Sequence, residues 1–321
     1  MIIFGVVCIK RRVIQIANST QLISLPRKWA LKYNIKKGDE LEIEEEGNRL
    51  VIGTEKSQEA KNIEIDITNL DRDSFMFLVR VLYIKGYDEI KINFKNPIVD
   101  HHRLNKKVNV MSEIHTEVNR LSGIEIIQQR ENFCILKVIS ESSIKDFDLI
   151  LRRVFLLVTD ASSDLVKGAS KRDRYLIESL EERHNTITKF MANGLRLLNK
   201  FGHPNYRNMP SYHSIIESLD KINDILKESA RFMVNKDFPI SKPCESILLD
   251  INSAIHDFYK LFYDFDFGLV EKLSSCRYRL VNNIEQLSKR LSKEELILVM
   301  KLERVVEEIL HSKVERMSMQ Y

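Results

Sequence analysis

The sequence predicts an α+β protein of three parts: a small β domain, an α/β domain and an all-α bundle. Three observations lead to this prediction. Short alternating apolar stretches with turn residues fill residues 13–53. Strand-like and helix-like patterns then alternate as far as residue 140. From there to the end, apolar residues recur three or four positions apart. We expect domains at residues 1–56, 60–140 and 143–321.

Charge is strongly separated within the first domain. Residues 1–38 contain no Asp or Glu, whereas six carboxylates gather in residues 39–46. A domain that is basic on one side can approach phosphates along that surface. The alternative interpretation is an ordinary solvated surface rich in charge. The candidate contacts are Lys10, Arg11, Arg12, Arg27, Lys28 and Lys32.

The first domain is expected to contain four short strands and one short helix. The strands fall at residues 13–17, 22–25, 40–46 and 49–53, and the helix follows Pro26 over residues 27–33. Trp29, Ala30 and Tyr33 are expected on the inner face of this helix. So few apolar residues cannot bury a core alone, so we expect an obligate dimer.

This segment resembles the AbrB/MazE/SpoVT family of swapped-hairpin DNA-binding domains. The resemblance rests on LISLP, YNIKKGDELEIE and NRLVI within residues 10–52. It implies that two chains interleave their hairpins and that basic side chains lie along double-stranded DNA. The chain departs from well-studied members at two places. Their Gly-Arg before the second strand is replaced by Gln21-Leu22, and their Arg pair in the short helix by Ala30-Leu31. The positive charge here is instead on Arg27, Lys28 and Lys32.

The second domain is predicted to be α/β, ferredoxin-like or a relative of that fold. Strands are expected at 63–67 and 89–94, helices at 74–86 and 110–123, and a hairpin from 125–129 with 133–139. Residues 97–109 contain His101, His102, Arg103, Lys106 and Lys107. We interpret this stretch as an exposed flexible loop rather than an anion or metal site, because no third ligand has a suitable spacing.

Six helices are expected in the third domain. Their ranges are 144–168, 172–201, 212–235, 244–265, 267–291 and 293–319, with Gly and Pro at the joints. Asp164…Gly168 and Asp264…Gly268 end the first and fourth helices, which indicates an internal duplication. The third and sixth helices also correspond.

The third and sixth helices resemble the repeated signature of the PhoU family, phosphate-signalling proteins built from two three-helix repeats. The signature is present as Asp220-x-x-x-Asp224 and Glu303-x-x-x-Glu307. Residues four apart share a helix face, so each pair offers oxygen ligands to a divalent or ferric ion. The alternative is an ordinary face neutralised by Lys221, Lys227 and Arg304. His184 with Glu181, and His311, are possible additional ligands.

The remaining sequence features narrow the functional class. The four cysteines (Cys8, Cys134, Cys244 and Cys276) are widely spaced, as expected for buried thiols in a reducing compartment. We find no secretory signal, no membrane-spanning stretch and no nucleotide-binding or catalytic motif, so a cytoplasmic protein without enzymatic activity is expected. Our leading hypothesis is a DNA-binding transcriptional regulator linked to phosphate uptake. The alternative is an adaptor that docks on a phosphate transporter or kinase and uses its first domain only to dimerise.

Overall fold

The computed structural model describes residues 10–16, 20–46, 49–54 and 60–321. The chain divides into two compact units, Met1–Lys61 and Asn62–Tyr321, and each is described here by itself. The turn residues Asn18-Ser19 and Gly47-Asn48 lie outside the described residues, as do Cys8 and residues 55–59.

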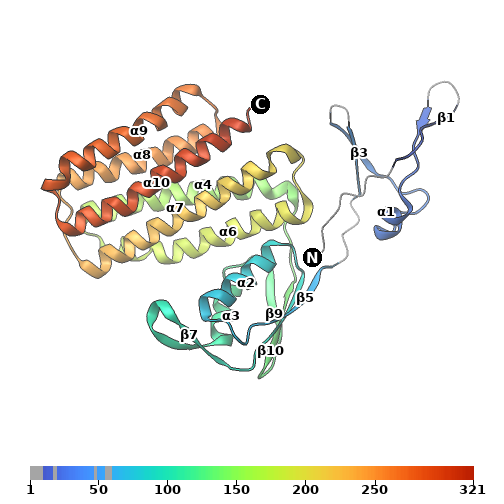
Figure 1. The fold of residues 1–321 in the computed structure, drawn as a ribbon, viewed down its shortest axis with the longest axis horizontal. Helices are drawn as coiled ribbons and strands as arrows, with labels where there is room; N and C mark the ends of the chain where they lie inside the picture. Colours follow the sequence, from blue (N-terminus) through green and yellow to red (C-terminus); the bar gives the residue numbers. More distant parts are fainter. Residues whose placement is uncertain (1–9, 17–19, 47–48, 55–59) are drawn as a thin grey trace. The chain divides into compact units, whose positions relative to one another are not determined.

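The first unit has the predicted order of strand, strand, helix, strand, strand (Figure 1). β1 (Ile14–Ile16) and β2 (Thr20–Leu22) form an antiparallel pair. α1 (Arg27–Lys32) begins directly after Pro26, whose fixed φ suits a helix start. β3 (Glu42–Glu46) and β4 (Arg49–Gly53) form the second antiparallel pair. Trp29 and Tyr33 are half-buried with ring centroids 5.3 Å apart, as expected for the inner face of α1.

Apolar side chains of the first unit are exposed to an unusual degree. Ile14 is 56% exposed and Ile43 62% exposed, although β-branched residues of this kind usually pack against a neighbour. Contiguous exposed apolar surface typically marks an interaction site. The exposed set is Val13, Ile14, Ile16, Leu22, Ile23, Leu31, Ile43 and Leu50. This exposure supports the expectation of a second copy, which stays a prediction.

We predict that Ile16→Asp shifts the full-length protein from dimer towards monomer at micromolar concentration, because a charge would be buried in the interface between copies. Gln15→Asp is the matched control, since neighbouring residues of a strand face opposite sides. Sedimentation measures both. A dimer that survives Ile16→Asp unchanged would show that these strands do not form the interface.

The second unit begins with a mixed four-stranded sheet. Its strands are β5 (Asn62–Asp66), β6 (Glu89–Asn93), β9 (Ile124–Gln129) and β10 (Phe133–Val138), in the order β5-β6-β10-β9. β5 and β6 are parallel neighbours, and the other two pairs are antiparallel. A ferredoxin-like sheet would insert a strand between the two parallel strands joined by the first helix. The strand order therefore departs from the ferredoxin-like expectation.

Two helices accompany this sheet. α2 (Arg72–Ile84) starts where the Asp71 side chain accepts hydrogen bonds from the backbone N–H groups of Asp73 and Ser74. α3 (Val110–Val118) is capped in the same way by Asn109. Phe75, Val79 and Ile114 are fully buried in the core that these helices form with the sheet.

The stretch that we expected to be a flexible loop is instead an ordered hairpin. β7 (Ile98–His101) pairs with β8 (Lys106–Asn109), and a single 3-10 turn (His102–Leu104) joins them. Val99 lies opposite Val108, and such β-branched cross-strand pairs favour pairing. The expectation was wrong because the polar residues between those two valines hid the strand pattern.

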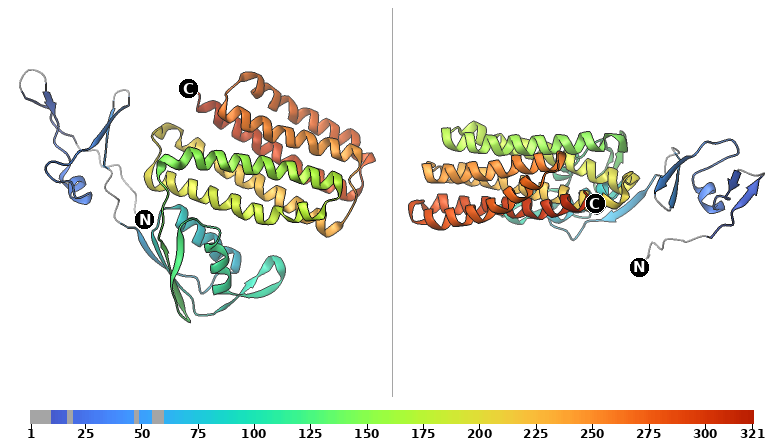
Figure 2. Two further views of the ribbon diagram at one scale, coloured as in Figure 1. Left: turned by 180° about the vertical axis from the view of Figure 1, so that it is seen from behind. Right: turned by 90° about the horizontal axis from the view of Figure 1, so that it is seen from above.

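The rest of the second unit is the predicted bundle of six long helices (Figure 2). These are α4 (Phe147–Lys171), α6 (Leu180–Phe201), α7 (Met209–Lys236), α8 (Lys242–Tyr263), α9 (Phe267–Leu287) and α10 (Lys293–Ser318). One expected helix, 172–201, is broken: Arg172 adopts a left-handed conformation at the end of α4, and the short α5 (Arg174–Glu178) is separated from α6 at Ser179. All six long helices contribute to one apolar core.

Three cysteines are buried free thiols, as expected, and burial raises the pKa of Cys134 and of Cys244 to about 12. Within the described ranges, no helix combines the length and apolar character needed to cross a bilayer.

A buried guanidinium joins the sheet layer to the bundle. Arg196 of α6 is 1% exposed and donates from Nη1 to the backbone oxygens of Tyr83 and Tyr87, both at 2.8 Å. Its Nη2 donates to Asp88 Oδ1 at 2.6 Å, and its Nε donates to Glu141 Oε1 at 2.9 Å. Asp88 and Glu141 also accept hydrogen bonds from Lys200, one turn further along α6. This network fixes α6 against the end of α2.

We predict that Arg196→Ala lowers the free energy of unfolding by about 3–5 kcal/mol, because it removes the donor to the Tyr83 and Tyr87 carbonyls and leaves Asp88 and Glu141 with Lys200 as their one remaining cation in this network. Asn199→Ala is the control on the same helix. It removes one exposed hydrogen bond to the Ile84 carbonyl, at 3.0 Å, so about 1 kcal/mol or less is expected. Urea unfolding measures both, and equal losses would contradict a central role for Arg196.

Candidate functional site

A charged cleft of about 220 Å³ lies where α2 and α3 face α6 and α7. Its two sides come from the sheet layer and from the bundle, so it depends on the junction at Arg196. Most of the side chains that line it are ionisable. The basic ones are Arg72, Arg80, Arg103, Arg120, Lys227 and Arg231, and the acidic ones are Asp73, Glu117, Glu181, Asp220, Asp224 and Glu228.

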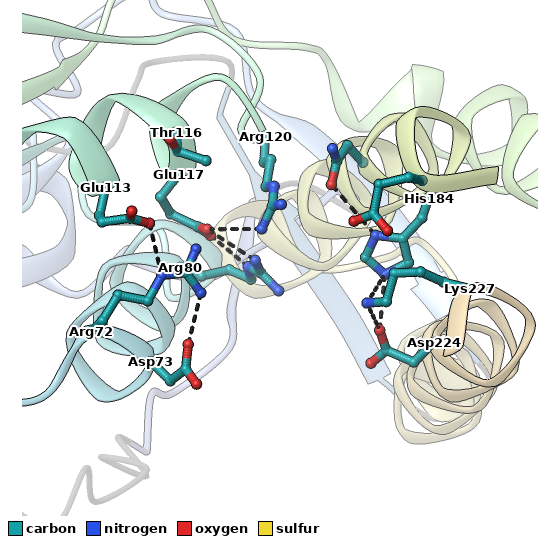
Figure 3. Close-up of polar contacts among 12 residues, drawn as sticks. Arg72, Asp73, Arg80, Glu113, Thr116, Glu117, Arg120, His184, Asp224 and Lys227 are labelled. Atoms are coloured by element: carbon teal, nitrogen blue, oxygen red, sulfur yellow. Dashed lines mark hydrogen bonds and ion pairs between the residues drawn. The ribbon is translucent and has the colours of Figure 1, made fainter. Parts of the chain in front are cut away.

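Arginines dominate the side of the cleft formed by α2 and α3 (Figure 3). Arg80 binds Glu117 in a two-pronged contact, with Nε–Oε1 2.6 Å and Nη2–Oε2 3.0 Å. Burial opposes the charged form of Arg80, but Glu117 and then Asp220 and Asp224 raise its pKa. Arg72, two turns earlier on α2, donates to Glu113 at 2.7 Å. Residues spaced in this way share one helix face.

Arg120 is the least compensated cation in this group. Its Nη1 lies 4.0 Å from Glu117, whose two oxygens already accept from Arg80. Its Nε is buried and has no hydrogen-bond partner among the described residues. Burial lowers the pKa of Arg120, Glu117 opposes this, and the charges of Arg80 and Arg72 lower it further. The arginine side of the cleft therefore has positive charge that its carboxylates do not fully balance.

The opposite side centres on Asp224 of α7. Its Oδ1 lies 2.9 Å from His184 Nε2 and accepts a hydrogen bond from Lys227 Nζ at 2.6 Å. Burial opposes the carboxylate, but these two contacts hold the pKa of Asp224 well below its usual range. One turn earlier, burial and the charge of Asp224 raise the pKa of Asp220. Two aspartates on one helix face thus have opposite shifts.

A second ion pair and a buried hydroxyl complete this side. Arg231 donates from Nε to Glu181 Oε2 at 2.6 Å. Thr188 lies one turn after His184 on α6 and is 3% exposed. Its Oγ1 finds no hydrogen-bond partner among the residues that the structure describes. Buried hydroxyls are usually satisfied, so this atom is an unused hydrogen-bonding group on a residue that lines the cleft.

The first predicted acidic pair, Asp220 and Asp224, lies in the cleft together with Glu181 and His184. The second pair lies elsewhere. Glu307 accepts a hydrogen bond from Arg277 of α9 at 2.6 Å, and the charge of Glu303 also acts on that guanidinium. His311 contacts Ser214 at 3.0 Å. In the described part of the chain, no group of three His, Cys, Asp or Glu side chains is arranged to hold a metal ion. Metal binding stays a prediction.

The residues expected to contact DNA are all exposed. They lie before β1 and on the outer face of α1, and they are Lys10, Arg11, Arg12, Arg27, Lys28 and Lys32. No carboxylate occurs on α1. Their contacts with DNA stay a prediction.

Comparison with protein families agrees with the arrangement of the first unit. Residues 14–61 match the family described as antidote-toxin recognition MazE, bacterial antitoxin. The N-terminal unit is MazE/AbrB-like. The match covers this unit and not the rest of the chain. Among curated proteins, no sequence matches this chain.

Solved structures similar to this chain include PhoU proteins. One is the phosphate transport system regulatory protein PhoU from Streptococcus pneumoniae, with 15% identity and a TM-score of 0.42, covering 55% of this chain and 94% of that one. Another is a putative PhoU-like phosphate regulatory protein from Shewanella oneidensis MR-1, with 13% identity and a TM-score of 0.42, covering 57% of this chain and 99% of that one.

Sequence reasoning missed the arginine side of the cleft. A signal was present: Arg72 and Arg80 lie eight residues apart on one helix, and Glu113, Glu117 and Arg120 lie four and three apart on the next. Both patterns give a charged face at helical spacing. Nothing local indicates that these two faces meet each other and the Asp220–Asp224 face.

We predict opposite effects of two isosteric substitutions at pH 7. Asp224→Asn lowers Tm, because a depressed pKa stabilises the fold above the unfolded value of about 3.9. Asp220→Asn raises Tm, because a raised pKa means that ionisation opposes folding above that value. The Asp224 difference should shrink as the pH falls below about 4, whereas the Asp220 difference should shrink at higher pH, through its raised pKa, and be absent below about 4. Thermal melts from pH 3 to 7 measure this, and shifts of the same sign would contradict it.

The same variants test the metal prediction. If Asp220 and Asp224 hold a divalent or ferric ion, metal should raise Tm of the wild type more than that of the double Asn variant. An equal rise in both, with no bound metal by elemental analysis, would leave these residues as an ion-paired face.

Proposed function

We propose that this protein is a DNA-binding transcriptional regulator that responds to phosphate status. The observation that supports DNA binding most directly is the MazE/AbrB-like first unit, with its exposed basic residues. Arg11 and Arg12 precede β1, and Arg27, Lys28 and Lys32 lie on α1. No catalytic role is proposed for either unit.

Phosphate contacts of this kind supply affinity without reading sequence. Basic side chains that neutralise DNA phosphates release condensed counterions, so binding weakens as salt increases. A dimer would present two such basic surfaces and extend the contact along the duplex. The exposed apolar strands support dimerisation, and the charge separation in the sequence supports approach from one side.

The link to phosphate rests on the second unit. Its sequence resembles the repeated PhoU signature at Asp220–Asp224 and Glu303–Glu307. Its cleft contains a guanidinium, that of Arg120, that its neighbouring carboxylate does not fully compensate. We propose that this unit senses phosphate status and that the first unit binds DNA.

An adaptor that docks on a phosphate transporter or kinase is the second candidate. The exposed apolar strands of the first unit favour it equally, because dimerisation alone would cover them. DNA affinity separates the two functions, since an adaptor of this kind needs none.

We predict that full-length protein binds duplex DNA with an affinity that falls steeply with salt, with a slope of about −0.9 in log K against log[salt] per phosphate neutralised. Arg11→Ala/Arg12→Ala should weaken binding to all sequences alike and reduce the slope. Arg130→Ala is the control, since Arg130 is exposed in the β9–β10 turn of the other unit. Fluorescence anisotropy measures all three. A flat salt response, or no loss in the double variant, would favour the adaptor.

A further inference from the structure

We propose that the cleft between α2, α3, α6 and α7 binds a small protonated oxyanion of the phosphate type, with Arg120 and Thr188 as its main contacts. This inference rests on the proposed function, because it names what the second unit would sense. Its main contacts are not the predicted metal ligands, although Asp220 and Asp224 line the same cleft, and the site draws on both layers of the second unit.

Arg120 provides the first argument. A guanidinium presents a planar set of N–H donors that matches the oxygens of phosphate or carboxylate. Here Nε is buried and unpartnered among the described residues, and Glu117 accepts from Arg80 at 2.6 and 3.0 Å while lying 4.0 Å from Arg120. An anion would satisfy the unused donor and offset the repulsion among Arg72, Arg80 and Arg120.

Thr188 provides a second and independent argument, from the opposite side of the cleft. Its hydroxyl is buried at 3% exposure and has no partner in the described part of the chain. An unsatisfied buried hydroxyl destabilises the fold, and a ligand oxygen that pairs with it would relieve this cost. The hydroxyl can donate to or accept from such an oxygen.

The size of the cleft limits the ligand. Pockets for drug-sized molecules have volumes of about 300–1,000 Å³. The cleft, at about 220 Å³, is smaller and is lined by charged groups rather than apolar ones. Inorganic phosphate or a short phosphate monoester suits this volume, and a dinucleotide does not.

The acidic side of the cleft indicates which oxyanion is preferred. Asp220, Asp224 and Glu228 would repel any anion unless it offers them a hydrogen bond that offsets the repulsion. Ionised carboxylates only accept hydrogen bonds, so a ligand that donates an O–H to them is favoured. Phosphate retains a proton near pH 7, and a hydroxylated phosphate ester carries O–H groups, whereas sulfate has no proton to donate. The cleft should therefore discriminate against sulfate.

The test uses the full-length protein with three probes: inorganic phosphate, glycerol 3-phosphate and sulfate. Isothermal titration calorimetry and thermal melts measure binding by wild type, Arg120→Ala, Thr188→Val and the control Arg130→Ala. We expect saturable binding of phosphate or of the ester by wild type and Arg130→Ala. Arg120→Ala should lose about tenfold or more in affinity, because a charge-assisted contact is removed. The stronger of the two phosphate probes identifies the ligand as free phosphate or an ester.

Thr188→Val keeps the test valid if Arg120→Ala folds poorly. Val has nearly the shape of Thr and removes an unpartnered hydroxyl, so Tm without probe should stay level or rise while affinity falls. Absence of saturable binding by both phosphate probes overturns the proposal, as does equal binding by Arg120→Ala and Arg130→Ala. Sulfate binding as tight as that of phosphate overturns the preference for a protonated anion. DNA binding is measured in parallel. If the wild type does not bind DNA, the proposed function is contradicted. If it binds DNA but neither phosphate probe, this inference alone is contradicted.

Discussion

Arg196 carries a permanent charge into a junction that excludes water, and the second unit is arranged to compensate that charge. The guanidinium donates to the Tyr83 and Tyr87 carbonyls and to the carboxylates of Asp88 and Glu141. Breaking such a network leaves buried charge, so α6 is held in one position against α2. The cleft follows from that position, because most of its arginines lie on the sheet layer and most of its acidic residues lie on the bundle. A loosely packed junction would not keep the two sides of the cleft in fixed positions relative to each other.

The sequence was informative wherever structure depends on local patterns. Alternating apolar residues and Pro26 predicted the elements of the first unit, and helical spacing predicted six long helices. The β7–β8 hairpin was missed because only Val99 and Val108 signal it. The sheet order could not be predicted, since strand periodicity does not specify which strands are neighbours. The cleft was half predicted: Asp220 and Asp224 form a motif, whereas Arg120 and Thr188 become a site only through long-range packing.

Asp220 and Asp224 show why a motif does not determine its own chemistry. They are the same residue type, one turn apart, yet the pKa of Asp220 is raised and that of Asp224 is depressed. The difference between the two pKa values arises from the residues around each carboxylate, because His184 and Lys227 contact Asp224. The ammonium of Lys227 already offsets the charge that would attract a metal ion to this pair. A cation would have to displace that contact, so any metal affinity here depends on Lys227 as much as on the carboxylates.

The two units would recognise phosphate groups under different electrostatic conditions. Arg11, Arg12 and the basic residues of α1 are exposed, so mobile ions screen them and counterion release governs their affinity for DNA. Arg120 is partly buried, with a side chain 21% exposed, and a charge in that environment is screened much less. A rise in ionic strength should therefore weaken DNA binding far more than occupation of the cleft. At high salt the protein would dissociate from DNA and retain its small ligand. Salt alone therefore separates DNA binding from ligand binding in an experiment.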